Sequence, residues 1–373
     1  MPLFSIIIPC YNQAHYLSDC LDALINQSFK DWEAIVINDG STDNTSEVTN
    51  RYCQNNNRIK LIEQNNQGLS AARNTGIKNA IGERLIFLDA DDFFYDNALE
   101  VISKTAQASD DYTMIQYGYA YISENKETVL RKVLPVQKKQ LIPDVFYAVP
   151  GPCHTIAVSK NLAEHCGPFD ITLKSLEDWD FWIRAAKCGA KIQTIQEPLV
   201  YYRYVKNSMS RNAFVMYDAF KTVANRAPLK DDRLPSTAPG NKTYNIHEQQ
   251  SFNGALIRML GVSIMQGKIE ESVAFFKQES SQPIYAYSPI QFEEMCSYLS
   301  FRYWYSKADI NYVLNELLPL FKQFFTSMGC TSAFISEAMY HIFKRHFYYS
   351  YINKYGRWVG SLFNYFLRKK YSK

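Results

Sequence analysis

The chain has 373 residues, of which 47% are hydrophobic and 21% charged, and its formal net charge is +3. This length and composition predict a globular protein of two domains with enough apolar residues for a sizeable core. No stretch approaches the ~20 uncharged apolar residues of a membrane-spanning helix. The eight cysteines contain no CxxC pair, so neither a zinc site nor a redox dithiol is expected.

Basic residues are concentrated at the C-terminal end. Residues 341–373 hold eight Lys or Arg and no Asp or Glu, which leaves 32 basic and 37 acidic residues elsewhere. Aromatic residues interleave with these cations, a composition that favours a helix lying on an anionic bilayer surface. A packed terminal helix pair with a solvated basic face is the alternative, and no nucleic-acid partner is expected.

The N-terminus begins with an apolar run that lacks the charged segment of a signal peptide. Cysteines without a disulfide framework are typical of a reducing compartment. The sequence therefore predicts a cytoplasmic protein, with peripheral binding to the inner face of the membrane as an open alternative.

The first quarter of the chain alternates between strands and helices. Except for 58–62, the predicted strands are short and mainly apolar runs, as expected for strands covered on both faces of a parallel sheet. Pro9 is expected to stop the first strand, Asn12 or Ser18 to cap the first helix, and Gly82 to end the third helix. This rhythm predicts right-handed crossovers and a parallel sheet. The predicted strands are 3–8, 32–37, 58–62 and 85–88, and the third helix covers 70–80.

Polar clusters follow three of these strands, at 9–12, 38–43 and 89–92. The ends of parallel strands meet at one edge of a sheet, so the clusters should line one crevice. In the last cluster Asp89, Asp91 and Asp92 would repel one another, and Mg²⁺ or Mn²⁺ would relieve that repulsion. An acidic solvated turn is the simpler alternative for this segment alone. The sequence contains no glycine fingerprint for a dinucleotide or a phosphate loop.

The segment from 93 to 212 changes character. Strands are predicted at 114–122, 128–133 and 154–158, and two short strands are predicted before Arg203. A helix begins near Leu176-Glu177-Asp178, where acids either cap the helix or provide a catalytic base. A carboxylate at a helix N-terminus is expected to have a lowered pKa, which an apolar wall from the flanking Trp179 and Trp182 could offset. Beyond a joint rich in proline, the periodicity is helical.

Four motifs now carry a resemblance. Residues 4 to about 212 resemble the catalytic domain of glycosyltransferase family 2, inverting enzymes of the GT-A fold that use nucleotide sugars. The match is specific because four weak motifs occur in the right order, each at a strand end. They are Ile7-Ile8-Pro9-Cys10-Tyr11-Asn12, Ile37-Asn38-Asp39-Gly40-Ser41-Thr42-Asp43, Asn66-Gln67-Gly68-Leu69-Ser70-Ala71-Ala72-Arg73-Asn74 and Phe87-Leu88-Asp89-Ala90-Asp91-Asp92.

The resemblance implies an α/β fold: a GT-A, Rossmann-like and mostly parallel sheet flanked by helices, followed by a mainly α-helical C-terminal region. The expected domains are a catalytic domain at 1–212, a joint at 213–244 and a helical domain with its basic aromatic tail at 245–373. Within the catalytic domain, 1–92 would be the nucleotide-binding half and 93–212 the acceptor half.

The resemblance also implies roles for single residues. Pro9, Tyr11 and Asp39 would hold the base, usually uracil, within motifs that include Asn12 and Ala90. Arg73 would lie near the diphosphate, Asp89 towards the ribose and Asp91 on a divalent metal, Mn²⁺ or Mg²⁺, with Asp92 structural. Asp178 would be the base. Many members have a metal-binding His where this chain has Val205, so Arg203 and Lys206 are expected to contact the phosphates instead.

These expectations describe an inverting transferase that moves a sugar, UDP-linked in the first instance, to an acceptor hydroxyl. The acceptor would be a saccharide or a lipid-linked saccharide of bacterial surface polysaccharide or glycolipid synthesis. Two alternatives stay open: a non-catalytic protein that binds nucleotide sugars or acts as a scaffold, and a nucleotidyltransferase, which would release pyrophosphate.

Overall fold

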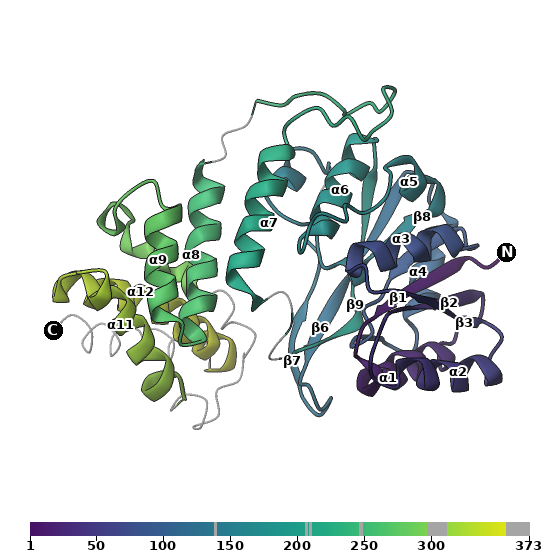
Figure 1. Ribbon diagram of the computed structural model, residues 1–373, viewed down its shortest axis with the longest axis horizontal. Helices are drawn as coiled ribbons and strands as arrows, with labels where there is room; N and C mark the ends of the chain where they lie inside the picture. Colours follow the sequence, from purple (N-terminus) through teal and green to yellow (C-terminus); the bar gives the residue numbers. More distant parts are fainter. Residues whose placement is uncertain (138–139, 206–207, 209–210, 246–248, 297–311, 356–373) are drawn as a thin grey trace. The chain divides into compact units, whose positions relative to one another are not determined.

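The computed structural model describes residues 1–137, 140–205, 208, 211–245, 249–296 and 312–355 (Figure 1). The chain divides into two compact units, one formed by 1–205 with 222–246 and the other by 206–221 with 247–373. Helix α7 (Ala213–Arg226) occupies the first part of the predicted joint. The predicted domain boundaries at 212 and 245 stay a prediction.

The first unit is built on a nine-stranded sheet with the strand order β3-β2-β1-β4-β8-β6-β9-β5, and β7 pairs with β6. It is a mixed α/β structure with a mostly parallel sheet flanked by helices. Its strands are β1 (Phe4–Cys10), β2 (Trp32–Asp39), β3 (Ile59–Gln64), β4 (Arg84–Phe87), β5 (Phe93–Phe94), β6 (Thr113–Ile122), β7 (Val129–Val133), β8 (Ile156–Ser159) and β9 (Lys191–Arg203). Its helices are α1 (Ala14–Ile25), α2 (Thr45–Asn55), α3 (Leu69–Asn79), α4 (Ala98–Gln107), α5 (Lys160–His165) and α6 (Glu177–Lys187), with 3-10 turns η1 (Asp144–Phe146) and η2 (Cys153–Thr155).

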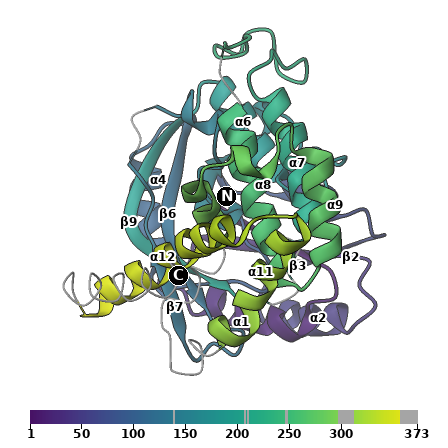
Figure 2. The same ribbon diagram turned by 90° about the vertical axis from the view of Figure 1, so that its left-hand side faces the viewer.

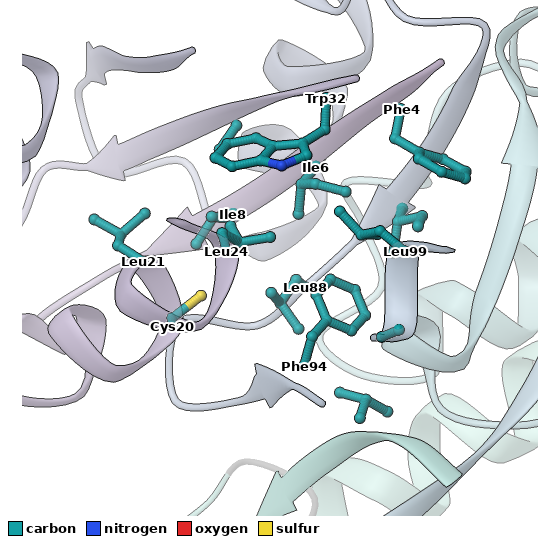
Figure 3. Close-up of a cluster of buried hydrophobic side chains, with 14 of the residues drawn as sticks. Phe4, Ile6, Ile8, Cys20, Leu21, Leu24, Trp32, Leu88, Phe94 and Leu99 are labelled. Carbon is teal, nitrogen blue, oxygen red and sulfur yellow. The ribbon is translucent and has the colours of Figure 1, made fainter. Parts of the chain in front are cut away.

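The parallel half of the sheet is covered on both faces. Phe4, Ile6 and Ile8 point into a fully buried cluster with residues of α1 and α4 (Figure 3). Ile7 points to the other face, because side chains alternate along a strand. A Cβ on Gly76 of α3 would lie 2.2 Å from Ile7 Cγ2, so glycine allows α3 to pack directly on this strand. In Figure 1, α1 and α2 lie on one face of these strands and α3 on the other.

The prediction that Pro9 stops the first strand is wrong, since β1 continues to Cys10 and Pro9 pairs with Ile37 of β2. Proline lacks the N–H that a strand with two neighbours would use. On the other side of β1 the pairing with β4 ends at Ile7 and Phe87. Pro9 therefore lies where β1 has only one neighbour, and the missing donor interrupts nothing.

The other half of the sheet is mixed. β8 is antiparallel to both β4 and β6, and β6 is parallel to β9. The two short strands predicted before Arg203 are wrong, because β9 is one continuous strand of 13 residues. Its register against β6 shifts between Tyr117 and Gly118, where Pro198 pairs. A bulge here accommodates the proline without ending the strand.

The second unit is helical. Phe292, Phe325 and Phe334 form an aromatic cluster, and α8 packs beside α9 (Figure 2). Its elements are α8 (Gln249–Met265), α9 (Ile269–Glu279), α11 (Leu318–Ser327), α12 (Ser332–Tyr355), 3-10 helices η4 (Ile284–Ala286) and η5 (Pro289–Cys296), and a π-helical turn, η7 (Val313–Leu317).

Among the described residues, no helix combines the length and the apolar character needed to cross a membrane. The predicted membrane-binding segment, 341–373, begins within α12, and its residues beyond Tyr355 lie outside the described part of the chain. Its binding to a bilayer stays a prediction.

Candidate active site

The polar clusters after β1 and β2 are bonded to each other. Asn12 Oδ1 accepts a hydrogen bond from the backbone N–H of Thr42 at 2.8 Å, and the N–H of Asn12 donates to Ser41 Oγ at 3.0 Å. Tyr11 stands beside this junction with 49% of its surface exposed, whereas Pro9 is buried in the strand. The two strand ends therefore form one rigid rim with an exposed aromatic ring.

The predicted caps of the first helix are wrong. Helix α1 begins at Ala14 after Gln13, and the Ala14 N–H donates to Asp43 Oδ2 at 3.0 Å. The Asn12 side chain is already bonded to Thr42, and Ser18 lies inside the helix. The backbone N–H of Ala14, which has no partner inside the helix, is therefore bonded by Asp43 from the loop after β2.

Asp39 at the end of β2 shapes the loop between β3 and α3. Its Oδ1 accepts from Gln64 Nε2 at 2.7 Å and from the Gln67 N–H at 2.9 Å, and its Oδ2 accepts from the Gly68 N–H at 2.8 Å. The residue is only 3% exposed. Base recognition by Asp39 stays a prediction, but its carboxylate is oriented by these donors.

The loop after β4, residues 89–92, is called the acidic loop here. Its carboxyls differ in pKa because their surroundings differ. Burial alone would raise the pKa of Asp89, but the Arg73 guanidinium and His154 lower it to about 2. Burial, together with the charges of Asp92 and Asp89, raises the pKa of Asp91 well above its usual value. Asp91 is therefore the carboxyl that has most to gain from an added cation. Ala90 between them is fully buried.

His154 in η2 is a site residue that the motifs missed. Its Nδ1 lies 2.9 Å from Asp92 Oδ2 and 4.0 Å from Asp89 Oδ2, and it is 1% exposed. Burial would lower the pKa of His154, but the charges of Asp92 and Asp89 raise it to about 9. Its position beside Cys153 carries no ligand spacing, so only the fold brings it to the acidic loop.

Asp89, Asp92 and His154 are also a candidate metal centre. One ligand atom from each lies within 4.8 Å of the others, and this is the only such triplet among the described residues. Asp92 Oδ2 and both ring nitrogens of His154 make no well-aligned hydrogen bond to any described residue. Two carboxylates and an imidazole this close together fit a divalent cation once His154 has lost its proton, because only the neutral ring has a lone pair for a metal. Asp91, the predicted ligand, is not part of the triplet.

Arg203 at the end of β9 is 3% exposed and forms hydrogen bonds with the acidic loop. Its backbone N–H donates to Asp92 Oδ1 at 2.8 Å, and its Nε donates to the carbonyl of Asp91 at 2.8 Å. Its remaining nitrogens donate to the Glu124 carbonyl and to Asp19 Oδ2, the latter at 2.7 Å. The predicted phosphate contact stays a prediction, and the guanidinium is engaged by protein here. Lys206 lies outside the described residues.

Arg73 on α3 is 2% exposed and joins two acids that are far apart in the chain. Its Nη2 donates to Asp89 Oδ1 at 2.9 Å, and its Nη1 donates to Glu177 Oε1. Its Nε is buried without a hydrogen-bond partner among the described residues. The predicted diphosphate contact is untested, and in this structure the guanidinium connects the acidic loop with the start of α6.

Helix α6 carries Asp178 and is anchored by aromatic packing. Phe181 stacks on Phe169 with ring centroids 4.3 Å apart, and Phe169 packs on Phe87 of β4. Trp179 Nε1 donates to the Val145 carbonyl at 2.6 Å. The residue before the helix, Leu176, has a left-handed φ of 56°, which is uncommon for a branched side chain. Such backbone strain is retained mainly at functional sites.

The pKa of Asp178 is raised and not lowered, so of the two opposing effects expected at this helix start, loss of solvent prevails. Burial and the adjacent Glu177 carboxylate raise the pKa of Asp178 to about 7, against the opposing effect of Arg73. The helix terminus alone would favour the ionised form. Here burial and the Glu177 charge outweigh it, although the Trp179 N–H that donates to Asp178 Oδ1 also favours the ionised form. A carboxylate with a pKa near 7 is suited to take up a proton at neutral pH.

The fold has close counterparts among solved structures. TarS of S. aureus, residues 1–349 in complex with UDP-GlcNAc, aligns with a TM-score of 0.53 at 18% identity, covering 92% of this chain and 91% of that one. The same protein in complex with UDP aligns with a TM-score of 0.50 at 20% identity over 85% and 92%. The fold and its acidic strand edge define the GT-A class.

Residues 5–166 match the family model described as Glycosyl transferase family 2. Residues 5–166 are therefore a domain of glycosyltransferase family 2, as the motifs predicted. EpsJ of Bacillus subtilis strain 168, an uncharacterised glycosyltransferase, is 29% identical over 56% of this chain and 63% of its own length. The glycosyltransferase EpsH of the same strain is 30% identical over 54% and 61%. GlyA of Streptococcus pneumoniae serotype 4 is 44% identical over 27% and 14%. The chain spans less than two thirds of the length of each of these relatives.

Proposed function

We propose that this protein transfers a sugar from a nucleotide diphosphate sugar to an acceptor hydroxyl with inversion at the anomeric carbon. UDP is the proposed nucleotide, supported by the family motifs and by the UDP and UDP-GlcNAc complexes of TarS. A saccharide or lipid-linked saccharide of bacterial surface polysaccharide or glycolipid synthesis is the proposed acceptor. The basic segment 341–373 would bring the enzyme to the membrane where such acceptors reside.

One observation carries this proposal. Asp178, a half-buried carboxyl whose pKa is raised to about 7, follows Glu177 in the chain, and Arg73 connects Glu177 with Asp89 at the end of a parallel strand. In a single-displacement transfer, the acceptor hydroxyl loses a proton to a base while the nucleotide diphosphate leaves from the opposite face. Asp178 is our candidate for that base. Pro9, Tyr11, Asn12 and Asp39 would hold the base and ribose end of the donor.

A divalent cation fits the acidic loop, as the clustered ligand atoms of Asp89, Asp92 and His154 and the raised pKa of Asp91 indicate. Asp91 would hold it together with the donor phosphates, and Asp89, Asp92 and His154 form the alternative ligand set. When bound, such an ion neutralises charge on the leaving diphosphate. The side chains of Asp92 and His154 are closed off by burial, which favours Asp91 as the ligand that donor phosphates can reach.

The products of the reaction test the proposed function. With a panel of nucleotide sugars, Mn²⁺ and saccharide acceptors, we expect release of a nucleoside diphosphate in step with a glycosylated product, because the sugar bond to the diphosphate is the one that breaks. Pyrophosphate release would instead identify a nucleotidyltransferase. Donor binding without any product, over the whole panel, would favour the non-catalytic alternative.

The metal assignment predicts a difference between two variants. Asp91→Asn should raise the Mn²⁺ concentration needed for half-maximal UDP binding by about 10-fold or more, because it removes a direct ligand. His154→Gln should change it less. Calorimetric titration of UDP at a series of Mn²⁺ concentrations measures both. The reverse order of effects would assign the ion to Asp89, Asp92 and His154.

A further inference from the structure

We propose that Glu177 is a positioning residue of the transfer reaction: through Arg73 it holds Asp178 in a fixed place relative to Asp89. The inference rests on the proposed function, since it takes Asp178 as the base and Asp89 as part of the donor site. It assigns to Glu177 a role that the motif alone leaves open, because an acid in the first turn of a helix is commonly a simple dipole partner.

The ion pairs Glu177–Arg73 and Arg73–Asp89, called the bridge below, join three elements of the first unit through one buried guanidinium. Arg73 comes from α3, Glu177 begins α6, and Asp89 follows β4. The side chains of Arg73 and Glu177 are 2% and 7% exposed, and that of Asp89 is 32% exposed. The open end of the bridge is therefore the donor side. The Phe169 ring lies 5.5 Å from Arg73 Cζ and limits the space around the guanidinium.

The bridge differs from the other buried ion pair of the same helix. Asp180, also in the first turn of α6, pairs with Arg184 of its own helix at 3.0 Å and with Arg233 at 2.8 Å. Those contacts fix α6 to the segment after α7 and do not reach the acidic loop. Glu177 is the first-turn acid whose partner also contacts the donor-side carboxylate. A role in the helix dipole requires no such partner.

Two consequences follow for Asp178. Geometrically, Glu177, the residue next to it in the chain, is bonded to Arg73, and this contact holds the start of α6 close to the acidic loop. Electrostatically, Asp178 faces Glu177 on its own helix, Arg73 on α3, Asp89 after β4 and Cys153 of η2. Glu177 and Asp89 raise the pKa of Asp178 and Arg73 lowers it, while burial raises the pKa of the Cys153 thiol and keeps it neutral.

The test compares Glu177→Gln with Asp180→Asn, a matched control on the same helix. Glutamine keeps an oxygen that can accept from Arg73 but removes the negative charge beside Asp178, so the positive charge of Arg73 is less compensated there. We expect the acid limb of the turnover profile to shift down by about one pH unit. Turnover at the alkaline plateau should fall by roughly tenfold, because a weaker and less firmly held base is left. The KM for the donor should change little.

Asp180→Asn should lower the thermal unfolding midpoint and leave the midpoint of the pH profile where it is. The inference is overturned if Glu177→Gln keeps the wild-type pH midpoint and loses turnover only in proportion to unfolded protein. It is also overturned if the two variants behave alike. The proposed function fails separately, if the wild type forms no glycosylated product or if Asp178→Asn turns over at the wild-type rate.

Discussion

Replacing Asp178 with Asn is expected to reduce turnover by about 100- to 10,000-fold, the usual effect of removing a general base. Asparagine has the same shape but cannot take the proton of the acceptor hydroxyl. UDP binding should be retained, because Asp178 lies on α6 rather than at the strand ends that would hold the nucleotide. Steady-state rates at saturating donor, combined with calorimetric UDP titration, separate the two effects.

The pH profile provides an internal control for this variant. The pKa of Asp178 is raised to about 7, so the carboxyl is protonated and inactive as a base below that pH. Wild-type turnover should therefore rise with pH through about 7 and level off above it, whereas the residual rate of Asp178→Asn should lack this limb. A wild-type rate that stays constant down to pH 5 would contradict the assignment of Asp178.

Replacing Arg73 with Met is expected to destabilise the protein by about 3–5 kcal/mol, the cost of leaving a buried ion pair without one partner. Methionine fills similar space, but the Glu177 carboxylate, 7% exposed, loses its counter-charge. The midpoint of urea unfolding should shift accordingly. Arg51→Met is the matched control, because its ion pair with Glu47 is 3.8 Å long and largely exposed, and such pairs contribute about 0–1 kcal/mol.

The same comparison has a defined pH dependence. In the wild type the pKa of Asp89 is lowered to about 2, so the stabilisation from its pairing is present at neutral pH and is lost as pH falls towards that value. In Arg73→Met the unpaired carboxyls can take up protons as the pH falls. The stability difference between the two proteins should therefore shrink in acid. A difference that is constant from pH 7 to pH 3 would indicate a packing effect instead.

The parallel strands could be predicted from the sequence because the central ones, such as β1 and β2, are buried on both faces. Every residue of Phe4–Cys10 and Trp32–Asp39 is buried and most are apolar, and the polar pair Ser5 and Glu33 bond to each other. The errors came where a distant residue decides the local structure. The start of α1 depends on Asp43, and the continuity of β9 depends on a bulge opposite Gly118, so local propensity could not predict either.

The motifs brought the strand-end residues together, but they did not predict the contacts between them. Arg73 and Glu177 are 104 residues apart in the chain, and His154 reaches Asp92 from a loop with no ligand spacing. Which of the two opposing effects on the pKa of Asp178 prevails could not be decided from the sequence, for a related reason. A helix terminus is visible in a sequence, whereas the depth of burial that outweighs it is a property of the assembled core.

The bonding of Asp39 bears on how nucleotide preference could change in this lineage. Under our proposal one carboxylate has two duties, because it would read the base and it already orders Gln64, Gln67 and Gly68. A substitution there would disturb the loop before it altered selectivity. Tyr11, in contrast, is 49% exposed beside the same rim, so a substitution there would disturb the loop less. Adaptation to another nucleotide, in nature or by directed evolution, would therefore proceed more readily through Tyr11 than through Asp39.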